Sequence, residues 1–322
     1  MSWVNPDEQL AQKGFEDYLL EGSLEAVTPV CAPTGENSVN LAGYCLGGTL
    51  AMTTLAYMTA KKDKRANSAT FFTTMLDFSE PGELGIFLDE GAVAGLEKKM
   101  QERGFLEGSE MAGTFNMLRA NDLIWSFVVN NYLMGKDPFP FDLLYWNSDS
   151  TRMPAAMHSF YLRNMYLGNL LREPGGLELG GVKIDLTKVK TPCYFISTVE
   201  DHIAPWKSTY MGARLPSGPT KFVLGGSGHI AGIVNPPVAN KYGYWTNDAT
   251  DGNLPENPED FLAGATQNAG SWWTHWNEWV TGLPGGSAKV KARKPEDGTL
   301  KVIEDAPGSY VKFRLDAQKK EK

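Results

Sequence analysis

The sequence has too few cysteines, too widely scattered, for a disulfide framework or a cysteine-based metal site. Its 322 residues include three cysteines, Cys31, Cys45 and Cys193, and no C-x-x-C pair. An odd number of separated cysteines argues against paired disulfides, and the four histidines lack the H-x-x-x-H spacing of a zinc site. We therefore expect no metal. Reduced thiols suit a cytoplasmic protein, so each cysteine has to be interpreted by itself.

The sequence also lacks long apolar runs and an excess of positive charge. No run is long enough to cross a bilayer, and the opening MSWVNPDEQL has neither the basic region nor the apolar stretch of a secretory signal. Asp and Glu number 38 against 30 Lys and Arg, a net charge of -8, whereas nucleic-acid binding requires a basic face. These absences predict a cytoplasmic protein with no transmembrane segment and no nucleic-acid partner.

Strand and helix patterns alternate along the first part of the chain. VNLAGYC is a short apolar strand, an Ala-, Leu- and Met-rich helix follows it, and a second apolar strand ends at Asp77. This strand–helix–strand order implies that the two strands pair in parallel. Strand patterns resume only at residues 191–201 and 221–229, after helices rich in aromatics and methionine. We predict an α/β fold with a core in two parts and a helical cap inserted between them: 1–78, 187–322 and 79–186.

The segment GYCLGG has the layout of a nucleophile elbow. In this G-x-S-x-G device, a sharp turn between a strand and a helix pushes a serine out into the active site. Here Cys45 takes the place of the serine, between Gly43 and Gly47. The small flanking residues are needed because strand and helix approach each other closely at the turn. A cysteine in such a place can also be a small buried apolar residue, and this is how we interpret Cys31 and Cys193.

A thiol nucleophile requires a base and a group that orients the base. In α/β-hydrolases these follow the nucleophile in the order acid, histidine, each at the carboxyl end of a strand. Asp201 ends the strand pattern CYFISTVED, and His229 ends KFVLGGSGH. His229 would withdraw the proton from Cys45, because the thiolate is the attacking species. Asp201 would hold the imidazole or accept a proton from a substrate hydroxyl. Taken alone, it is better explained as a turn residue. The backbone N–H of Leu46 is the expected oxyanion donor.

Four tryptophans lie close together in the segment SWWTHWNEWV. Trp272, Trp276 and Trp279 fall on one face of a helix, with Trp273 beside them. Amphipathic aromatic side chains of this kind suit contact with an apolar polymer or granule surface. They also suit packing of the helix on the sheet, which is the interpretation we favour.

Six motifs, in order, resemble those of the catalytic domain of a class I polyhydroxyalkanoate synthase. They extend over nearly the whole chain, and the elbow G-Y-C-x-G-G is specific. The tyrosine before the cysteine resembles enzymes that favour short-chain substrates. The motifs are GYCLGGT, LDFSEPGELG, VEDHIAPW, GGSGHIAGIVNPP, SWWTHWNEWV and APGSYVKFR.

The resemblance implies an α/β-hydrolase fold and the polymerisation of (R)-3-hydroxyacyl-CoA thioesters, such as 3-hydroxybutyryl-CoA, with release of CoA. Cys45 would carry the growing polyester as a thioester, and His229 would be the general base. Asp201 would activate the 3-hydroxyl of the bound acyl group or support the histidine. His202 and Trp206 would lie near the site. No cofactor is implied, since CoA leaves as a product of the substrate.

The resemblance also implies a homodimer associated with polymer granules in the cytoplasm, with granule-associated proteins as partners. Members of the family carry an N-terminal domain and the first strands of the hydrolase core, and we do not find these in this sequence. We therefore expect an exposed sheet edge, and lower stability and activity than in a complete synthase.

Two other functions stay open at this point. An acyl-CoA thioesterase would use the same fold and nucleophile but would give the acyl group to water. A catalytically inactive fragment would result if the absent strands abolish the site. The cysteine nucleophile and the motifs favour polyester synthesis over hydrolysis, and only experiment separates synthesis from an inactive fragment.

Overall fold

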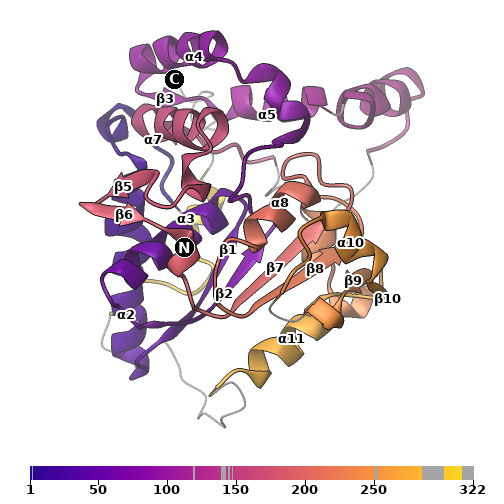
Figure 1. Cartoon of the computed structure of the whole chain (residues 1–322). Helices are drawn as coiled ribbons and strands as arrows, with labels where there is room; N and C mark the ends of the chain where they lie inside the picture. The colour runs from indigo at the N-terminus through magenta and orange to yellow at the C-terminus, as the bar shows by residue number, and fades with distance from the viewer. Residues whose placement is uncertain are drawn as a thin grey trace.

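The structure is a computed structural model that describes residues 1–313 apart from residues 2, 119, 139–142, 144, 145, 147, 251, 252 and 285–300. At its centre lies a six-stranded sheet with the strand order β1-β2-β7-β8-β9-β10 (Figure 1). Two short two-stranded ladders, β3 (Phe105–Leu106) with β4 (Met153–Pro154) and β5 (Leu177–Leu179) with β6 (Val182–Ile184), accompany it. The strands of the central sheet are β1 (Val39–Tyr44), β2 (Ala66–Phe72), β7 (Cys193–Thr198), β8 (Thr220–Gly225), β9 (Tyr244–Thr246) and β10 (Thr266–Asn268).

The pairing within the sheet brings the ends of distant segments together. β1, β2, β7 and β8 run parallel to one another, whereas β9 and β10 pair antiparallel. Tyr44 at the end of β1 lies opposite Phe72, and Phe72 lies opposite Ile196 of β7. Because parallel strands end at the same edge of a sheet, the residues that follow β1, β7 and β8 gather at one place. The predicted parallel strand–helix–strand unit is confirmed.

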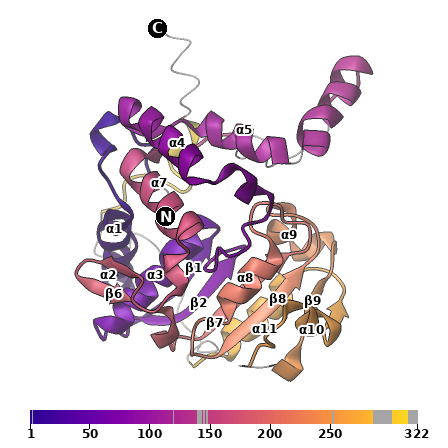
Figure 2. The same ribbon diagram turned by 45° about the horizontal axis from the view of Figure 1, so that its top comes forward.

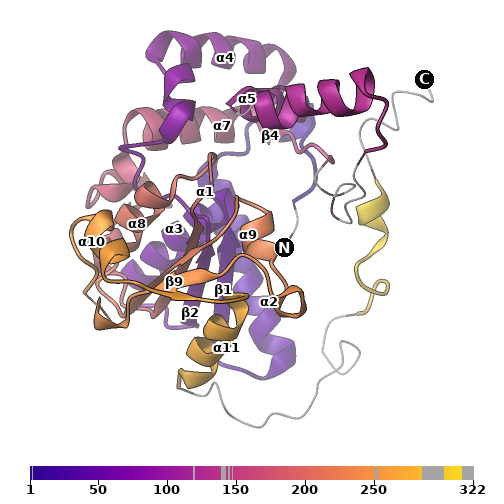
Figure 3. The same cartoon turned by 90° about the vertical axis from the view of Figure 1, so that its right-hand side faces the viewer.

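Helices cover both faces of the sheet, as the three views in Figures 1, 2 and 3 show. Successive residues of β7 point to opposite faces, so that Phe195 belongs to one apolar cluster and Tyr194 to the other. Both faces of a parallel sheet are normally buried in this way. The helices on the first face are α3 (Leu46–Ala60), α8 (Trp206–Ala213) and α10 (Pro258–Ala263), and those on the second are α9 (Ala231–Val234) and α11 (Trp273–Gly282).

The segment between β2 and β7, residues 73–192, is largely helical, and we call it the insert. Figures 1 and 3 show three of its helices together beyond one end of the sheet. They are α4 (Glu90–Arg103), α5 (Gly108–Leu118) and α7 (Ala155–Tyr161). π-helical turns follow α5 and α7, at Asn121–Trp125, Val128–Leu133 and Leu162–Leu167. Before the sheet, α1 (Phe15–Asp17), a π-helix (Tyr18–Leu24) and α2 (Glu25–Thr34) lead to β1.

A buried carboxylate joins the two ends of the insert. One oxygen of Asp77 accepts a hydrogen bond from Asn169 Nδ2 at 2.9 Å, and the other lies 2.7 Å from Arg172 Nη1. Burial opposes ionisation of Asp77, but hydrogen bonds from Ser79 and Asn169 and the charge of Arg172 keep the pKa of its carboxyl below the usual value. The insert is therefore anchored by a charged group next to β2.

The tryptophans of α11 pack against the sheet. Trp272 is fully buried, and its Nε1–H donates to the carbonyl oxygens of Gly232 and Ile233. Trp276 Nε1–H donates to Thr70 Oγ1 of β2 at 2.9 Å. The packing interpretation of this segment is confirmed for these two residues. Among the described residues, no helix has the length and apolar character needed to span a membrane.

His158 of α7 makes the stability of the fold sensitive to acid. Its side chain is buried, its Nδ1 lies 3.0 Å from Met153 Sδ, and burial lowers its pKa from 6.5 to about 4. In the unfolded chain it takes up a proton at higher pH than in the folded one. Its contribution to stability is therefore complete above pH about 6.5 and is lost as the pH falls towards 4, by up to about 3 kcal/mol.

We expect His158→Met to remove this part of the pH dependence. Urea denaturation gives the free energy of unfolding of the wild type and of the variant at a series of pH values between about 4 and 7.5. The free energy should fall less steeply with falling pH in the variant than in the wild type. A variant that loses as much stability on acidification as the wild type would contradict the assignment to His158.

Candidate active site

The turn that carries Cys45 has a strained backbone. Cys45 lies between the end of β1 and the start of α3, with φ 53° and ψ −122°. A positive φ is uncommon in any residue other than glycine, and such strain collects at functional sites. The turn is fixed on both sides, because the N–H of Cys45 donates to Phe72 O of β2 and its carbonyl oxygen accepts from Gly48 N, each at 2.9 Å. The elbow geometry predicted from GYCLGG is present.

The close approach of strand and helix involves Gly43 and Gly48. A Cβ added at Gly43 would lie 2.5 Å from Gly48 Cα, and one added at Gly48 would lie 1.8 Å from Thr74 Oγ1. A Cβ at Gly47 would meet nothing within 4 Å. The expectation that Gly47 is needed for the close approach was therefore wrong, since the second tight position is one residue further along the helix.

This difference can be tested with three alanine variants. Gly43→Ala has to displace backbone atoms of α3, and we expect it to destabilise the fold by about 2–3 kcal/mol. Gly48→Ala should cost a similar amount, whereas Gly47→Ala should leave the stability unchanged or raise it, by up to about 1 kcal/mol. Urea denaturation of the three variants measures these values. Equal stabilities for Gly43→Ala and Gly47→Ala would contradict the geometry of the elbow.

Asp201 and His229 form a buried pair at the ends of β7 and β8. His229 Nδ1–H donates to Asp201 Oδ2 at 2.7 Å, and both residues are buried. The other oxygen of Asp201 accepts from the N–H groups of Ile203 at 2.8 Å and Ala204 at 2.9 Å. Asp201 is thus both a turn residue and the partner of His229, so the two interpretations of the sequence do not exclude each other.

His229 connects Asp201 to Cys45. Burial, the largest influence, disfavours a charged imidazole, but hydrogen bonds with Asp201 and Cys45 and the negative charges of both groups raise the pKa of His229 to about 10. Tyr44 supports the imidazole from the side of β1. Its hydroxyl donates to His229 O at 2.7 Å, and the two rings lie 5.2 Å apart. The three residues singled out in the sequence therefore lie together, with His229 between the carboxylate and the thiol.

Cys45 and His229 line an apolar cavity of about 580 Å³ between the core and the insert. The core contributes Leu46, whose N–H begins α3, and the insert contributes side chains such as Leu96, Phe115 and Tyr161. A volume of this order and an apolar lining with few polar groups are typical of sites that bind small molecules.

A match to a family model follows the same elements. Residues 7–236 match the model described as the alpha/beta hydrolase fold, which includes β1, the elbow, the insert, and the turns that hold Asp201 and His229. The chain belongs to the α/β-hydrolase fold family. The α/β class and the hydrolase type of core are therefore confirmed.

Three relatives of this α/β-hydrolase are poly(3-hydroxyalkanoate) polymerases. The chain is 53% identical to the polymerase subunit PhaC of Rhizobium meliloti, over 98% of this chain and 50% of that protein. It is 50% identical to the polymerase of Methylorubrum extorquens, over 98% and 51%. It is 42% identical to the polymerase subunit PhaC of Cupriavidus necator, over 98% and 53%. The chain spans about half the length of these relatives.

Two residues predicted to lie near the site of this α/β-hydrolase are placed beside the cavity rather than on it. His202 directly follows Asp201 and lines a separate surface pocket with it. Trp206 is the first residue of α8 and packs against the main apolar cluster of the core. Neither belongs to the residues that line the cavity with Cys45.

Two tyrosines that the sequence analysis did not single out line the cavity. Tyr161 and Tyr166 lie on the last turns of α7 and the π-helix after it, with their rings 5.4 Å apart. Burial raises the pKa of both phenols, and the charge of Cys45 raises both further, so the hydroxyls stay protonated. In the sequence, a tyrosine at a buried position of a helix looks like any other core residue. The place of these two tyrosines in the cavity could therefore be recognised only from the structure.

Proposed function

We propose that this chain is an acyltransferase that polymerises (R)-3-hydroxyacyl-CoA thioesters into polyhydroxyalkanoate. The observation that carries the proposal is the contact of Cys45 with a histidine whose pKa is raised, at an elbow, in an apolar cavity. The 53% identity to a poly(3-hydroxyalkanoate) polymerase supports the same chemistry. Short-chain substrates such as 3-hydroxybutyryl-CoA form part of the proposal.

The first step is a thioester exchange. His229 accepts the proton of the Cys45 thiol, and the sulfur attacks the carbonyl carbon of the substrate thioester. The backbone N–H of Leu46 donates to the oxyanion that forms. When the bond between the carbonyl carbon and the sulfur of CoA breaks, the CoA sulfur takes the proton from His229. Cys45 then carries the acyl group as a thioester.

The second step forms the ester bond. The 3-hydroxyl of another hydroxyacyl group attacks the thioester on Cys45, and His229 accepts the hydroxyl proton. The carbon–sulfur bond breaks, and the sulfur of Cys45 regains a proton from His229. We assign Asp201 to positioning rather than to proton transfer, because its two oxygens already accept from His229 Nδ1 and from two backbone N–H groups.

A sulfur nucleophile suits this sequence of steps. Exchange of one thioester for another keeps the acyl group activated, whereas an oxyester on serine would be a poorer donor to the next hydroxyl. The apolar side chains of the insert over Cys45 would keep water from the intermediate. We therefore propose that residues 79–186 work as a cap, which has to move for CoA substrates to enter.

The proposal extends to a homodimer at polymer granules in the cytoplasm. Figures 2 and 3 show the segment after α5 projecting away from the sheet, and exposed apolar side chains on it suit contact with a second copy. Sedimentation equilibrium that gives only monomer would contradict the dimer, and a fluorescent fusion spread evenly through cells that contain granules would contradict the location. The exposed residues are Trp125, Phe127, Tyr132 and Leu133.

The test is incubation of the chain with (R)-3-hydroxybutyryl-CoA, with free CoA and the acyl product both measured. We expect CoA release together with oligomeric or polymeric ester. CoA release with only free 3-hydroxybutyrate would instead establish a thioesterase. No CoA release from a folded chain would indicate an inactive fragment and would contradict the proposal.

A further inference from the structure

A pocket of about 900 Å³, which we call the basic pocket, lies at the other end of the sheet from Cys45. Its walls come from the segment between α3 and β2, from β6 with the turn before β5, and from the segment that leads into β7. Cys45 follows the carboxyl end of β1, whereas these segments lie at the amino ends of β2 and β7. α3 has 15 residues and extends about 22 Å from Cys45 to the pocket. The basic pocket is therefore separate from the cavity at Cys45.

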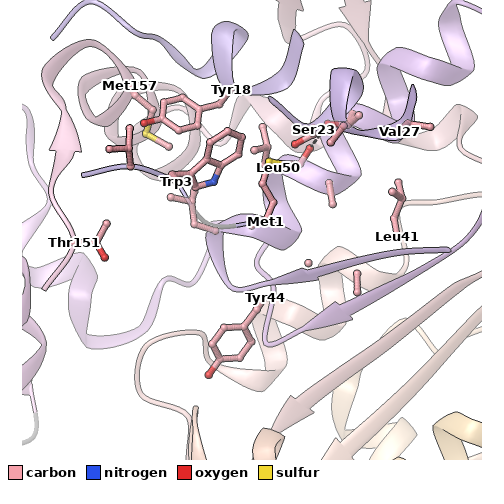
Figure 4. A pocket seen from close by; sticks show the side chains of 18 of the residues that line it. Met1, Trp3, Tyr18, Ser23, Val27, Leu41, Tyr44, Leu50, Thr151 and Met157 are labelled. Atoms are coloured by element: carbon pink, nitrogen blue, oxygen red, sulfur yellow. Dashed lines mark hydrogen bonds between the residues drawn. The ribbon is translucent and has the colours of Figure 1, made fainter. Parts of the chain in front are cut away.

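The basic pocket differs in charge from two other hollows of the chain. The hollow beside β1, of about 740 Å³, is lined mainly by apolar side chains such as Trp3, Tyr18 and Met157 (Figure 4), and its one charged lining residue among those described is Arg152. The cavity at Cys45 has the carboxylate of Glu110 and two histidines. The five lysines of the basic pocket are Lys62, Lys64, Lys183, Lys188 and Lys190. They gather positive charge at one place in a chain whose net charge is -8.

The two carboxylates of the basic pocket already have other partners. Asp63 Oδ2 lies 2.7 Å from Arg65 Nη2, and Asp185 Oδ1 accepts from the N–H of Thr187 at 3.0 Å and from its hydroxyl. All five lysines are exposed, and within the described part of the chain none of them forms an ion pair with a carboxylate. Like charges that line one pocket without partners repel one another, and an anion placed among them relieves that repulsion.

The positions of the lysines are not explained by local structure alone. Lys62 follows the end of α3 with φ 60°, at a place where glycine usually ends a helix. A cation near the carboxyl end of a helix is favourable, which accounts for a lysine after α3. It does not account for Lys183 on β6 or for Lys188 and Lys190 before β7. Three separate segments therefore bring lysines to the same pocket.

Most of the other residues that line the basic pocket are small and apolar. They include Ala56 and Ala60 of α3, Ala66 of β2, and Pro174. A concave pocket of this volume suits a small molecule rather than a flat protein surface. A ligand that fits has negative groups for the lysines and an uncharged body for the apolar lining.

We propose that the basic pocket binds a small organic phosphate of the nucleotide type. Its phosphate groups lie among the lysines, which bind phosphate as point charges, and its uncharged part lies against the alanines. The inference goes beyond the proposed function and does not depend on acyl chemistry at Cys45. Because CoA also carries phosphate groups, the experiment has to distinguish this pocket from the cavity at Cys45.

The experiment is isothermal titration calorimetry of the full 322-residue chain with ATP as the probe, at low ionic strength. Adenosine and inorganic phosphate are titrated separately, because each supplies one half of the expected contacts. We expect ATP to bind at one site, at least about tenfold more tightly than either adenosine or phosphate. Binding should weaken as NaCl is added, since salt screens exposed charges.

A matched pair of variants places the ligand. Lys190→Glu reverses one charge of the basic pocket and should weaken ATP binding by at least about tenfold. Lys98→Glu makes the same charge change on an exposed side chain of α4, which does not line the basic pocket. It should bind ATP as the wild type does. Circular dichroism checks that both variants are folded.

Three results would overturn the inference: no heat of binding with ATP, adenosine that binds as tightly as ATP, or equal weakening by Lys190→Glu and Lys98→Glu. ATP binding that Lys190→Glu leaves intact and that alkylation of Cys45 abolishes would overturn it too, in favour of the cavity at Cys45. The comparison of ATP, adenosine and phosphate uses the unmodified chain, so it decides the matter even where the variant fails to fold. Release of CoA is measured separately, so a failure here leaves the proposed function untouched.

Discussion

Replacing Cys45 by alanine is expected to lower the rate of CoA release from (R)-3-hydroxybutyryl-CoA by at least about 1,000-fold, because Cys45 is the one thiol among the described residues that line the cavity. Alanine keeps the Cβ and therefore leaves the backbone at φ 53° as it is. The fold should be unaffected, so the loss reports the thiol alone. CoA release, followed with a thiol reagent, measures the effect.

Two further variants serve as controls. Cys31→Ala removes a thiol from α2, which does not line the cavity, and should keep the wild-type rate. Cys45→Ser keeps a nucleophile of similar size but forms an oxyester, so it should be far slower than the wild type at making polymer. Equal rates for Cys45→Ala and the wild type would show that the reaction takes place elsewhere.

Replacing Asp201 by asparagine should lower the reactivity of Cys45 by about 100- to 10,000-fold, the range in which positioned acid–base groups act. Asp201 and Cys45 are the two hydrogen-bond partners that raise the pKa of His229 to about 10, and the hydrogen bond with Asp201 contributes more. Without its charge, the imidazole is a weaker base and takes the proton of Cys45 less completely. The rate of alkylation of Cys45 by iodoacetamide, measured against pH, follows this directly and needs no substrate.

The pH dependence distinguishes a charge effect from a packing effect. His229 holds its proton more tightly in the folded chain than at its ordinary pKa of 6.5. Its contribution to stability is therefore complete below pH about 6.5 and is lost as the pH rises towards 10. Asp201→Asn should reduce this loss and should make alkylation at neutral pH slower. An alkylation profile identical to that of the wild type would contradict the role of Asp201.

The elements of the site could be predicted because each has a local signal. A glycine-flanked cysteine between a strand and a helix, and an acid and a histidine at the ends of two later strands, appear in the sequence as short patterns. Parallel pairing then brings Cys45, Asp201 and His229 to one edge of the sheet. Their roles as nucleophile, orienting group and base remain predictions that the variants above test.

What could not be predicted depends on distances between elements. The sequence indicated Gly43 and Gly47 as the tight positions at the elbow, but the second of them is Gly48, which lies against Thr74. Tyr161 and Tyr166 reach the cavity only through the packing of the insert. His202 and Trp206 lie close to Asp201 in sequence, yet the turn and α8 direct them to other surroundings.

The most direct test of this account is peptide mapping by mass spectrometry after the chain is mixed with (R)-3-hydroxybutyryl-CoA and quenched in acid. We expect a 3-hydroxybutyryl group, or a short oligomer of it, on the peptide that contains Cys45, and none on the same peptide of Cys45→Ala. CoA release with Cys45 unmodified at every time point, or an acyl group on Cys31 or Cys193 instead, would contradict it.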